Sequence, residues 1–295
     1  MQHKTLRGNL LLIVAAVIWG SAFVAQSEGM AYVGPFSFGA IRYIIGGIVL
    51  VPFAWFFSRN DENKDVRGTV FGGIMCGLAL FAASTLQQIG IQYTTVAKSG
   101  FLTAMYIVLV PILRIVMGKR STVRVWICVL IAAVGVYFLC AIDGFSINMG
   151  DGLTILCALM FSVHICVVDY FVQKHSGVWL ACIQFIVVGI VSTPFMFIFE
   201  SPAVADICNA WVAILYTAIF SSGIAYTFQI LGQRDTNPVV ASLIMSTESL
   251  FAALSGWVIL GQEMSLRELF GSLLMICAIV FAQLPEKKRL IHTKK

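Results

Sequence analysis

The chain has 295 residues, of which 59% are hydrophobic and 11% are charged, and its mean hydropathy is +0.93. A water-soluble domain needs more charged surface than this composition supplies, so we expect an all-α integral membrane protein with many spans. The net charge of +5 comes from basic residues in short segments between apolar runs. No basic patch carries interleaved aromatic residues, which argues against nucleic-acid binding.

The eight cysteines lie singly in apolar segments, without a Cys-x-x-Cys pair. This spacing predicts neither a disulfide framework nor a metal site, and we interpret the cysteines as small buried hydrophobic residues. No cofactor motif is present. The first apolar run is longer than the apolar region of a signal peptide and leads into further spans, so we expect it to be retained.

Ten apolar segments of about 20 residues, the length that crosses a bilayer, follow one another along the chain. Counting Lys and Arg in alternate connections places fifteen on one side and only two, Lys98 and Arg267, on the other. The positive-inside rule then predicts cytoplasmic termini and a multi-pass protein of the cell inner (plasma) membrane. The predicted spans are residues 9–27, 34–57, 68–91, 95–117, 123–142, 151–172, 177–199, 210–231, 237–260 and 266–284.

The second half of the chain repeats residues of the first half at a nearly constant spacing of 142. We therefore expect two repeats of five spans, residues 1–144 and 145–295. An odd number of spans per repeat places the second repeat upside down relative to the first, as in secondary transporters whose site lies near the midplane. The recurring pairs include Gly47 and Gly189, Pro52 and Pro194, and Gly90 and Gly232.

The ninth span has a carboxylate, Glu248, at its centre. An ionisable group there costs roughly 2.5–3.5 kcal/mol on insertion scales, so such groups usually face away from lipid and have a function. At 100° per residue the bulky residues form a separate side, which we predict to face lipid, while Glu248 faces the interior of the bundle or a water-filled path. That bulky side consists of Leu243, Leu250, Leu254 and Trp257.

Polar side chains also follow single faces of three other predicted spans. Such stripes serve either close packing between helices or the lining of a polar cavity, and four helices with stripes would enclose one. The stripes hold Ser99, Thr103 and Tyr106 in the fourth span, Ser84, Gln88 and Gln92 in the third, and Ser222, Tyr226, Gln229 and Gln233 in the eighth.

Three short motifs, together with the doubled plan, resemble the EamA-domain transporters of the drug/metabolite transporter superfamily. The resemblance covers nearly the whole chain and implies a ten-helix basket with a central cavity, helices 5 and 10 at the periphery, and movement of small metabolites, often outward. The chain departs from the family where Glu248 precedes a serine instead of a proline. The motifs are Trp19-Gly20-Ser21-Ala22-Phe23, Ile41-Arg42-Tyr43 and Gly261-Gln262-Glu263.

Several other residues are candidates for the site, each with a plainer alternative. Arg42 suits a substrate carboxylate or a pair with Glu248, but equally a structural bond. Lys98 opens the fourth span, where a helix N-terminus favours anions, or else is a surface lysine reaching water. His164 suits either a proton relay or a hydrogen-bonded core. Trp19 and Tyr106 stack on a substrate or fill space.

The function that these patterns favour is secondary transport of a small molecule, an amino acid or a drug-like solute, by alternating access and in the outward direction. Protons are candidate coupling ions, with Glu248 and His164 as their carriers. A channel without coupling stays open as an alternative, since polar stripes do not by themselves indicate alternating access. A membrane enzyme is disfavoured because no catalytic motif occurs, and an ATP-driven pump by the lack of a phosphate-binding loop.

Overall fold

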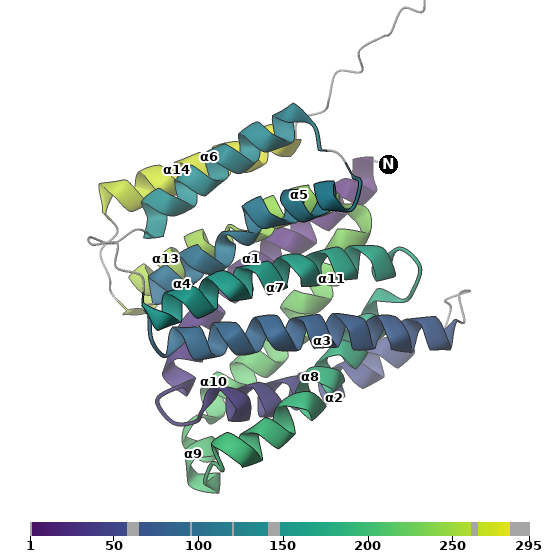
Figure 1. The fold of residues 1–295 in the computed structure, drawn as a ribbon, viewed down its shortest axis with the longest axis vertical. Helices are drawn as coiled ribbons and strands as arrows, with labels where there is room; N and C mark the ends of the chain where they lie inside the picture. Colours follow the sequence, from purple (N-terminus) through teal and green to yellow (C-terminus); the bar gives the residue numbers. More distant parts are fainter. Residues whose placement is uncertain are drawn as a thin grey trace, which may run out of the picture.

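The computed structural model describes residues 2–57, 65–94, 96–119, 121–140, 148–260 and 265–283 (Figure 1). Its helices are α1 (Gln2–Gly29), α2 (Pro35–Phe57), α3 (Val66–Ile91), α4 (Val96–Ala104), α5 (Tyr106–Val116), α6 (Val123–Cys140), α7 (Met149–Val172), α8 (Gly177–Phe199), α9 (Val204–Asn209), α10 (Trp211–Tyr216), the π-helix η1 (Thr217–Tyr226), α11 (Thr227–Asp235), α12 (Pro238–Met245), α13 (Glu248–Leu260) and α14 (Leu266–Gln283).

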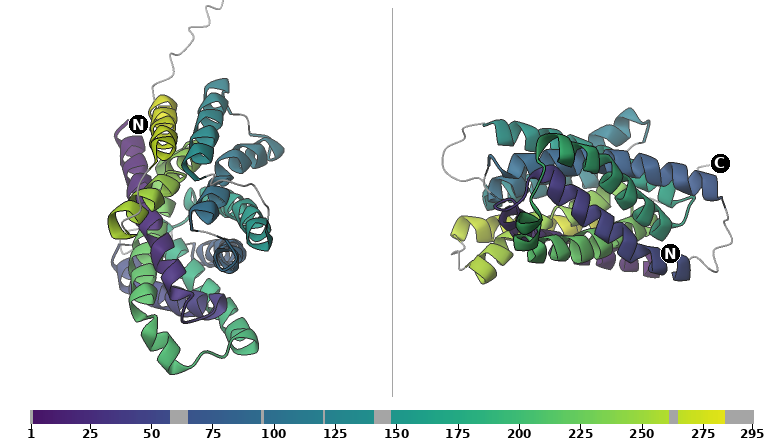
Figure 2. Two further views of the ribbon diagram at one scale, coloured as in Figure 1. Left: turned by 90° about the vertical axis from the view of Figure 1, so that its left-hand side faces the viewer. Right: turned by 90° about the horizontal axis from the view of Figure 1, so that it is seen from below.

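Within this described part, eight segments are long and apolar enough to cross a membrane, and two shorter apolar helices accompany them. The shorter ones fall in α6 and α14. Together they confirm the ten predicted crossings. Helix α1 begins at the same end of the bundle at which α14 finishes (Figures 1 and 2).

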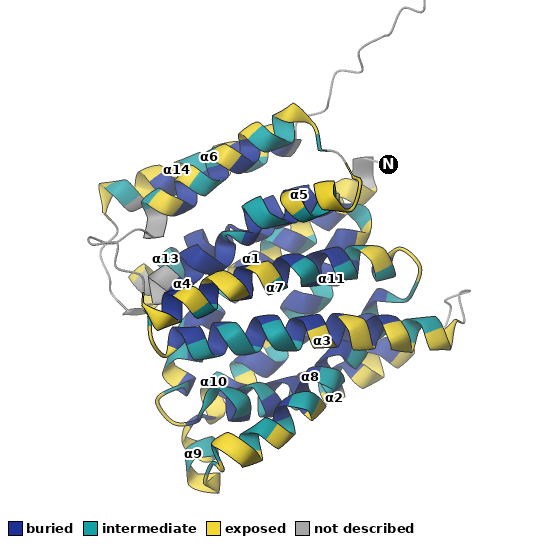
Figure 3. Ribbon diagram, in the orientation of Figure 1, coloured by how far each residue is buried: buried dark blue, intermediate teal, exposed yellow. Residues whose placement is uncertain are grey.

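The helix faces turned inward are buried and those turned outward are exposed (Figure 3). Among the described residues the exposed set contains many large apolar side chains, and the buried set contains polar ones beside the apolar core. Large apolar side chains such as Ile48, Leu130 and Phe197 are exposed on its surface. The amides of Gln184 and Gln233 are buried. Lipid solvates apolar side chains but satisfies no polar group, so a membrane protein keeps its amides against other helices.

Helices α2 and α8 pack together through a reciprocal contact between repeat-equivalent residues. A Cβ atom added to Gly189 would overlap the side chain of Ile44, and one added to Gly47 would lie 2.9 Å from Cγ1 of Ile186. Each glycine and each isoleucine recurs at the same spacing of 142. A two-fold axis produces contacts of this kind, in which the second pair of residues repeats the contact of the first pair with the two helices exchanged.

A second pair of contacts follows the same symmetry. An added Cβ at Gly90 on α3 would lie 3.1 Å from the carbonyl oxygen of Gly150 on α7, and one at Gly232 on α11 would lie 2.9 Å from that of Gly8 on α1. The α3–α7 pair is therefore the repeat equivalent of the α1–α11 pair. The small residues let these helices approach closely, as membrane helices do. The chain is thus two inverted five-helix repeats.

Helices α6 and α14 pair with each other at one edge of the molecule (Figure 1, top). They are the fifth and tenth crossings, and this position is the one that the resemblance implies. The Gly261-Gln262-Glu263 motif before α14 and the predicted repeat boundary at residue 144 lie outside the described residues.

The fourth and ninth crossings are each interrupted in the middle. Helix α4 ends at Ala104 and α5 begins at Tyr106, while α12 ends at Met245 and α13 begins at Glu248. The interruptions contain tighter i to i+3 bonds, including the bond from Thr247 N to the Ile244 oxygen at 3.2 Å. Such tightening inside a helix often marks a functional hinge.

The predicted lipid face of the ninth crossing is wrong. Leu243 and Leu250 have exposed fractions of 0% and 7%, whereas Trp257 is 53% exposed. Two physical reasons explain the error. The interruption at Ser246 and Thr247 breaks the regular 100° rotation, and the crossing lies deep in the bundle, with neighbours on nearly every side.

The reciprocal contact makes a prediction about stability. Substitution of Gly189 by Leu forces a side chain into the space of Ile44, and overpacking of this kind costs about 1–3 kcal/mol. We expect Gly47→Leu and Gly189→Leu each to lower the thermal unfolding midpoint of the purified protein in detergent. Gly152→Leu on α7 is the matched control, because nothing lies within 4 Å of its added Cβ. Equal midpoints for all three variants would contradict the packing.

Candidate functional site

A cavity lies at the centre of the bundle, with an empty volume of about 500 Å³. Both repeats contribute to its wall, through crossings 1 to 4 of the first and 6, 8 and 9 of the second. The lining residues are Trp19, Phe23 and Gln26 on α1, Arg42 and Tyr43 on α2, Gln87 on α3, Thr103 on α4, Tyr106 on α5, Phe161 and Ile165 on α7, Ser221 and Tyr226 on η1, Gln229 on α11, Met245 on α12 and Glu248 on α13.

The first residues of α5 and α13 meet in this cavity. The hydroxyl of Tyr106 donates a hydrogen bond of 3.1 Å to Oε1 of Glu248, and both side chains are buried. Each residue begins the second half-helix of its crossing. Corresponding half-helices of two inverted repeats that touch each other lie close to the axis that relates the repeats, so this bond lies near the pseudo-two-fold axis.

The sequence around Glu248 explains why the ninth crossing can be interrupted here. The hydroxyl of Ser246 donates to the Leu243 oxygen at 2.8 Å, and that of Thr247 to the Ile244 oxygen at 2.6 Å. These bonds satisfy carbonyl groups next to the interruption, which would be costly to bury unpaired in a membrane. As the first residue of α13, Glu248 also meets the positive end of the helix dipole, which favours a carboxylate there.

Arg42 lies in the same cavity without an acidic partner. It is 3% exposed, and it donates to Oε1 of Gln26 at 2.9 Å and to the hydroxyl of Tyr43 at 3.1 Å. Its guanidinium group also lies 4.5 Å from the ring centroid of Tyr43. Among the described residues it forms no ion pair, so the anticipated pairing with Glu248 is absent, and its Nε atom has no hydrogen-bond partner.

Aromatic rings form one wall of the cavity around Tyr226. The rings of Trp19 and Tyr226 meet edge to face at 4.8 Å, and Phe185 packs behind Tyr226 at 5.8 Å. The indole nitrogen of Trp19 donates to the carbonyl oxygen of Ser221 at 3.4 Å. Ser221 belongs to the π-helix η1, and π-helical segments are frequent at functional sites.

The structure brings most of the predicted site residues together. Trp19, Arg42, Thr103, Tyr106, Tyr226, Gln229 and Glu248 all line the cavity. Gln88, Ser99 and His164 are buried but do not line it. The side chain of Lys98 lies outside the described residues.

The three buried residues outside the cavity wall differ in their hydrogen bonds. His164 bonds through Nε2 to Oε1 of Gln184 at 3.0 Å, as the core alternative expects. The amide of Gln88 has no hydrogen-bond partner among the described residues. The hydroxyl of Ser99 likewise has none there.

Sequence reasoning missed Gln26, Tyr43 and Gln87. Gln87 bonds to the hydroxyl of Thr103 at 3.2 Å inside the cavity, while its neighbour Gln88 points elsewhere. Two adjacent amides point to different sides of a helix, and helical periodicity does not say which side meets the cavity. Gln26 offered a signal, since it is the only amide in the middle or outer half of the first crossing.

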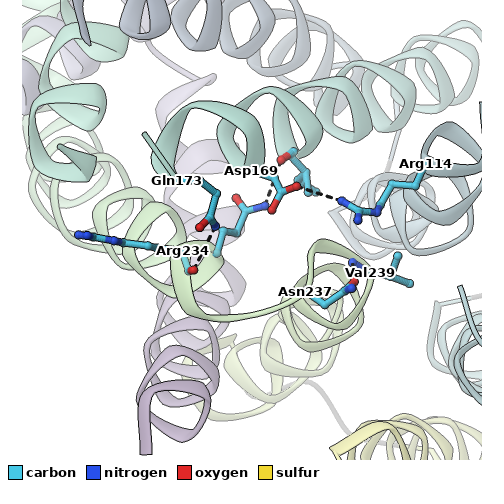
Figure 4. Close-up of polar contacts among 8 residues, drawn as sticks. Arg114, Asp169, Gln173, Arg234, Asn237 and Val239 are labelled. Atoms are coloured by element: carbon cyan, nitrogen blue, oxygen red, sulfur yellow. Dashed lines mark hydrogen bonds and ion pairs between the residues drawn. The ribbon is translucent and has the colours of Figure 1, made fainter. Parts of the chain in front are cut away.

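Polar contacts join the helices at one end of the bundle, beyond the cavity (Figure 4). Arg114 and Asp169 form an ion pair of 2.9 Å between α5 and α7. Gln173 donates to the carbonyl oxygen of Arg234 at 3.0 Å and so links α7 to α11. Arg114 is eight residues after Tyr106, about 12 Å along the crossing at 1.5 Å per residue. These contacts tie α5 to α7 and α7 to α11 at this end.

No group of three or more His, Cys, Asp or Glu side chains in the described part of the chain could hold a metal ion. The cavity instead offers one cation, one acid, hydrogen-bonding amides and aromatic faces. This set suits reversible binding of a small polar organic molecule.

Inverted repeats around a polar cavity near the midplane are an architecture that many secondary transporters share. The profile of the EamA-like transporter family matches residues 6–141 and again 148–283. The chain therefore belongs to the EamA-like transporter family and is a multi-pass membrane protein.

Related proteins support this assignment. An uncharacterized transporter of Archaeoglobus fulgidus is 31% identical over 95% of this chain and 87% of its own length. A WAT1-related chloroplastic protein of Arabidopsis thaliana is 24% identical over 94% of this chain and 69% of its own. A solved crystal structure has the same fold, with a TM-score of 0.77 and 18% identity over 94% of this chain and 96% of that chain.

Gln87 lines the cavity and Gln88 does not, and this difference can be tested. Gln87→Leu removes a hydrogen-bonding group from the cavity wall, and loss of such a bond costs about 1–3 kcal/mol. We expect about tenfold weaker apparent affinity in solute exchange by proteoliposomes. Gln88→Leu is the control: it should exchange normally and be equally or more stable, because it removes a buried amide without a described partner. A larger transport defect in Gln88→Leu than in Gln87→Leu would contradict this placement.

Proposed function

We propose that this protein is a secondary transporter that exports a small zwitterionic solute of the amino-acid type by alternating access, with protons as the coupling ion. The observation that carries the proposal is the buried Arg42 without a carboxylate partner, in the same cavity as Glu248. The substrate carboxylate supplies the missing partner of Arg42. Its ammonium group lies toward Glu248 and the aromatic wall.

The energetic argument rests on the cost of a lone buried charge. Leaving one charge of a buried pair uncompensated costs about 3–5 kcal/mol, and the neutral partners Gln26 and Tyr43 offset this cost without supplying an opposite charge. A bidentate bond between a guanidinium group and a carboxylate removes that cost when the substrate binds. The rings of Trp19 and Tyr226 add stacking or cation–π attraction for the other part of the solute.

Alternating access follows from the position of the Tyr106–Glu248 bond. The bond joins the two repeats at the centre of the bundle, so rocking of one repeat against the other around this site can break it and give Glu248 another partner. A Glu248 that changes partner in this way takes up a proton on one side and releases it on the other. We assign the end that carries the Arg114–Asp169 ion pair to the cytoplasmic side of the plasma membrane, in agreement with the distribution of basic residues.

Three other functions remain as alternatives to test. An uncoupled channel or facilitator would use the same cavity without a coupling acid. A carrier of apolar drug-like solutes would use the aromatic wall and leave Arg42 as a structural group. A membrane-embedded enzyme is a weaker candidate, because family membership favours transport over catalysis.

The proposed role of Arg42 is tested by counterflow of radiolabelled amino acids in proteoliposomes. We expect saturable exchange by the wild-type protein and at least a tenfold loss in Arg42→Gln, which keeps hydrogen bonding but removes the charge that binds the carboxylate. Arg67→Gln, at an exposed arginine at the start of α3, is the matched control and should exchange normally. Full exchange by Arg42→Gln would exclude the carboxylate site, and flux that never saturates would favour the channel.

The proposed role of Glu248 is tested by separating exchange from coupling. Glu248→Gln keeps the shape of the side chain and its bond to Tyr106 but cannot ionise. We expect it to retain counterflow and to lose accumulation driven by a pH gradient. Glu28→Gln is the matched control, because Glu28 is an exposed acid near the end of α1 and outside the cavity; this variant should retain both activities. Unaltered pH-driven accumulation in Glu248→Gln would remove this acid from the mechanism, and loss of folded protein would assign it to structure.

A further inference from the structure

A second hollow opens on the side of the bundle, away from the central cavity. It is a groove with an empty volume of about 1470 Å³, bounded by α1, α2, α8, η1 and α11. Its walls are apolar along most of its length, formed by residues such as Val49, Phe53, Ile219 and Phe228. Small residues, Gly177 and Gly223, contribute to its lining and leave room between the helices.

One end of the groove is basic. Arg7 on α1 and Arg234 on α11 both line it, and both are exposed. A smaller hollow shares these two arginines and adds Lys4 and Asp235. Three basic residues and one acidic residue therefore lie together, which leaves two net positive charges. Arg7 is near the start of the first crossing and Arg234 near the end of the eighth, so the charges lie where a membrane meets water.

The length of the groove fits a lipid tail in one leaflet. From Arg234 to Ile219 the wall extends over 15 residues of the eighth crossing, roughly 20 Å at 1.5 Å per residue. Half of a hydrocarbon core is about 15 Å thick. A molecule with its head at the arginines and its tail along Ile219 therefore fits a single leaflet, with the tail in the apolar part.

We propose that this groove is a specific binding site for an anionic phospholipid. Arg7, Arg234 and Lys4 bind the phosphate and its negative head group, and one acyl chain lies against Val49, Ile219 and Phe228. Basic pockets between membrane helices select anionic head groups, since each cation near the surface favours the anion. A neutral phospholipid fills the apolar part equally well but leaves the net positive charge uncompensated.

The groove shares a wall with the central cavity. Ile219 and Gly223 of η1 line the groove, while Ser221 and Tyr226 of the same π-helix line the cavity. The bound lipid thus supports the outer face of the segment whose inner face contacts the proposed substrate. The site itself does not depend on the transport mechanism, so it can be tested by binding alone.

The test uses the purified, delipidated protein and native mass spectrometry with phosphatidylglycerol and phosphatidylcholine of identical acyl chains. We expect the wild-type protein to prefer phosphatidylglycerol. Each arginine contributes about fivefold to this preference, so Arg7→Gln/Arg234→Gln lowers it on the order of 30-fold. Arg7→Lys/Arg234→Lys keeps the charge and should retain most of it. Arg67→Gln, outside the groove, should leave it unchanged.

A second variant tests the apolar part. Val49→Trp places a large ring in the groove and should weaken binding of both lipids at least severalfold.

Should the double arginine variant fail to fold, the single variants are compared, each with an expected fivefold loss. Equal binding of the two lipids by the wild type, or an unchanged preference in the arginine variants, would overturn the proposal. Displacement of the lipid by glycerol phosphate together with normal binding by Val49→Trp would indicate a site for a free anion instead, and would also overturn it.

Discussion

The contact between Tyr106 and Glu248 is the point on which the two halves of this protein depend. It joins the first residues of the second half-helices of the fourth and ninth crossings, at the centre of a membrane-spanning bundle. A carboxylate there is expensive unless a donor and a polar cavity accompany it. The hydroxyl of Tyr106, the start of α13 and the hydroxyls of Ser246 and Thr247 supply the polar groups that let the interruption exist.

The symmetry that produces this contact is maintained by glycines at the helix crossings. Gly47 and Gly189 pack against Ile186 and Ile44, so that a single pattern of small and branched residues is used twice. Such interfaces are dense and leave little freedom for one helix to slide past the other. Movement between the repeats is therefore expected at the interrupted fourth and ninth crossings, whose hydrogen bonds are irregular, more than at the tightly packed α2–α8 contact.

Features that depend on composition and spacing were predictable from the sequence. The ten crossings follow from runs of apolar residues and the two repeats from the recurrence of residues at a spacing of about 142. The cost of polar groups in lipid predicted that mid-span Arg42 and Glu248 lie inside the bundle, and both are buried. Contacts that depend on helical phase were not. The interruption at Ser246 and Thr247 placed Leu243 and Leu250 in the interior, and the choice between Gln87 and Gln88 needed the rotation of α3 about its axis. The π-helix η1 has no sequence signal comparable to a proline. Which of its residues line the cavity and which line the groove is known only from the structure.

The cavity departs from two-fold symmetry where its charges lie, and a physical reason exists for this. A glutamate at both positions 106 and 248 would place two carboxylates in one buried cavity, where each disfavours the ionised form of the other. Tyr106 opposite Glu248 keeps the hydrogen bond and avoids that repulsion. Arg42 is likewise matched in the second repeat by the neutral Gln184, which bonds to His164. A symmetric scaffold thus holds one acid and one cation in its cavity. Under the proposed function, these unlike ends give a bound solute a single preferred orientation.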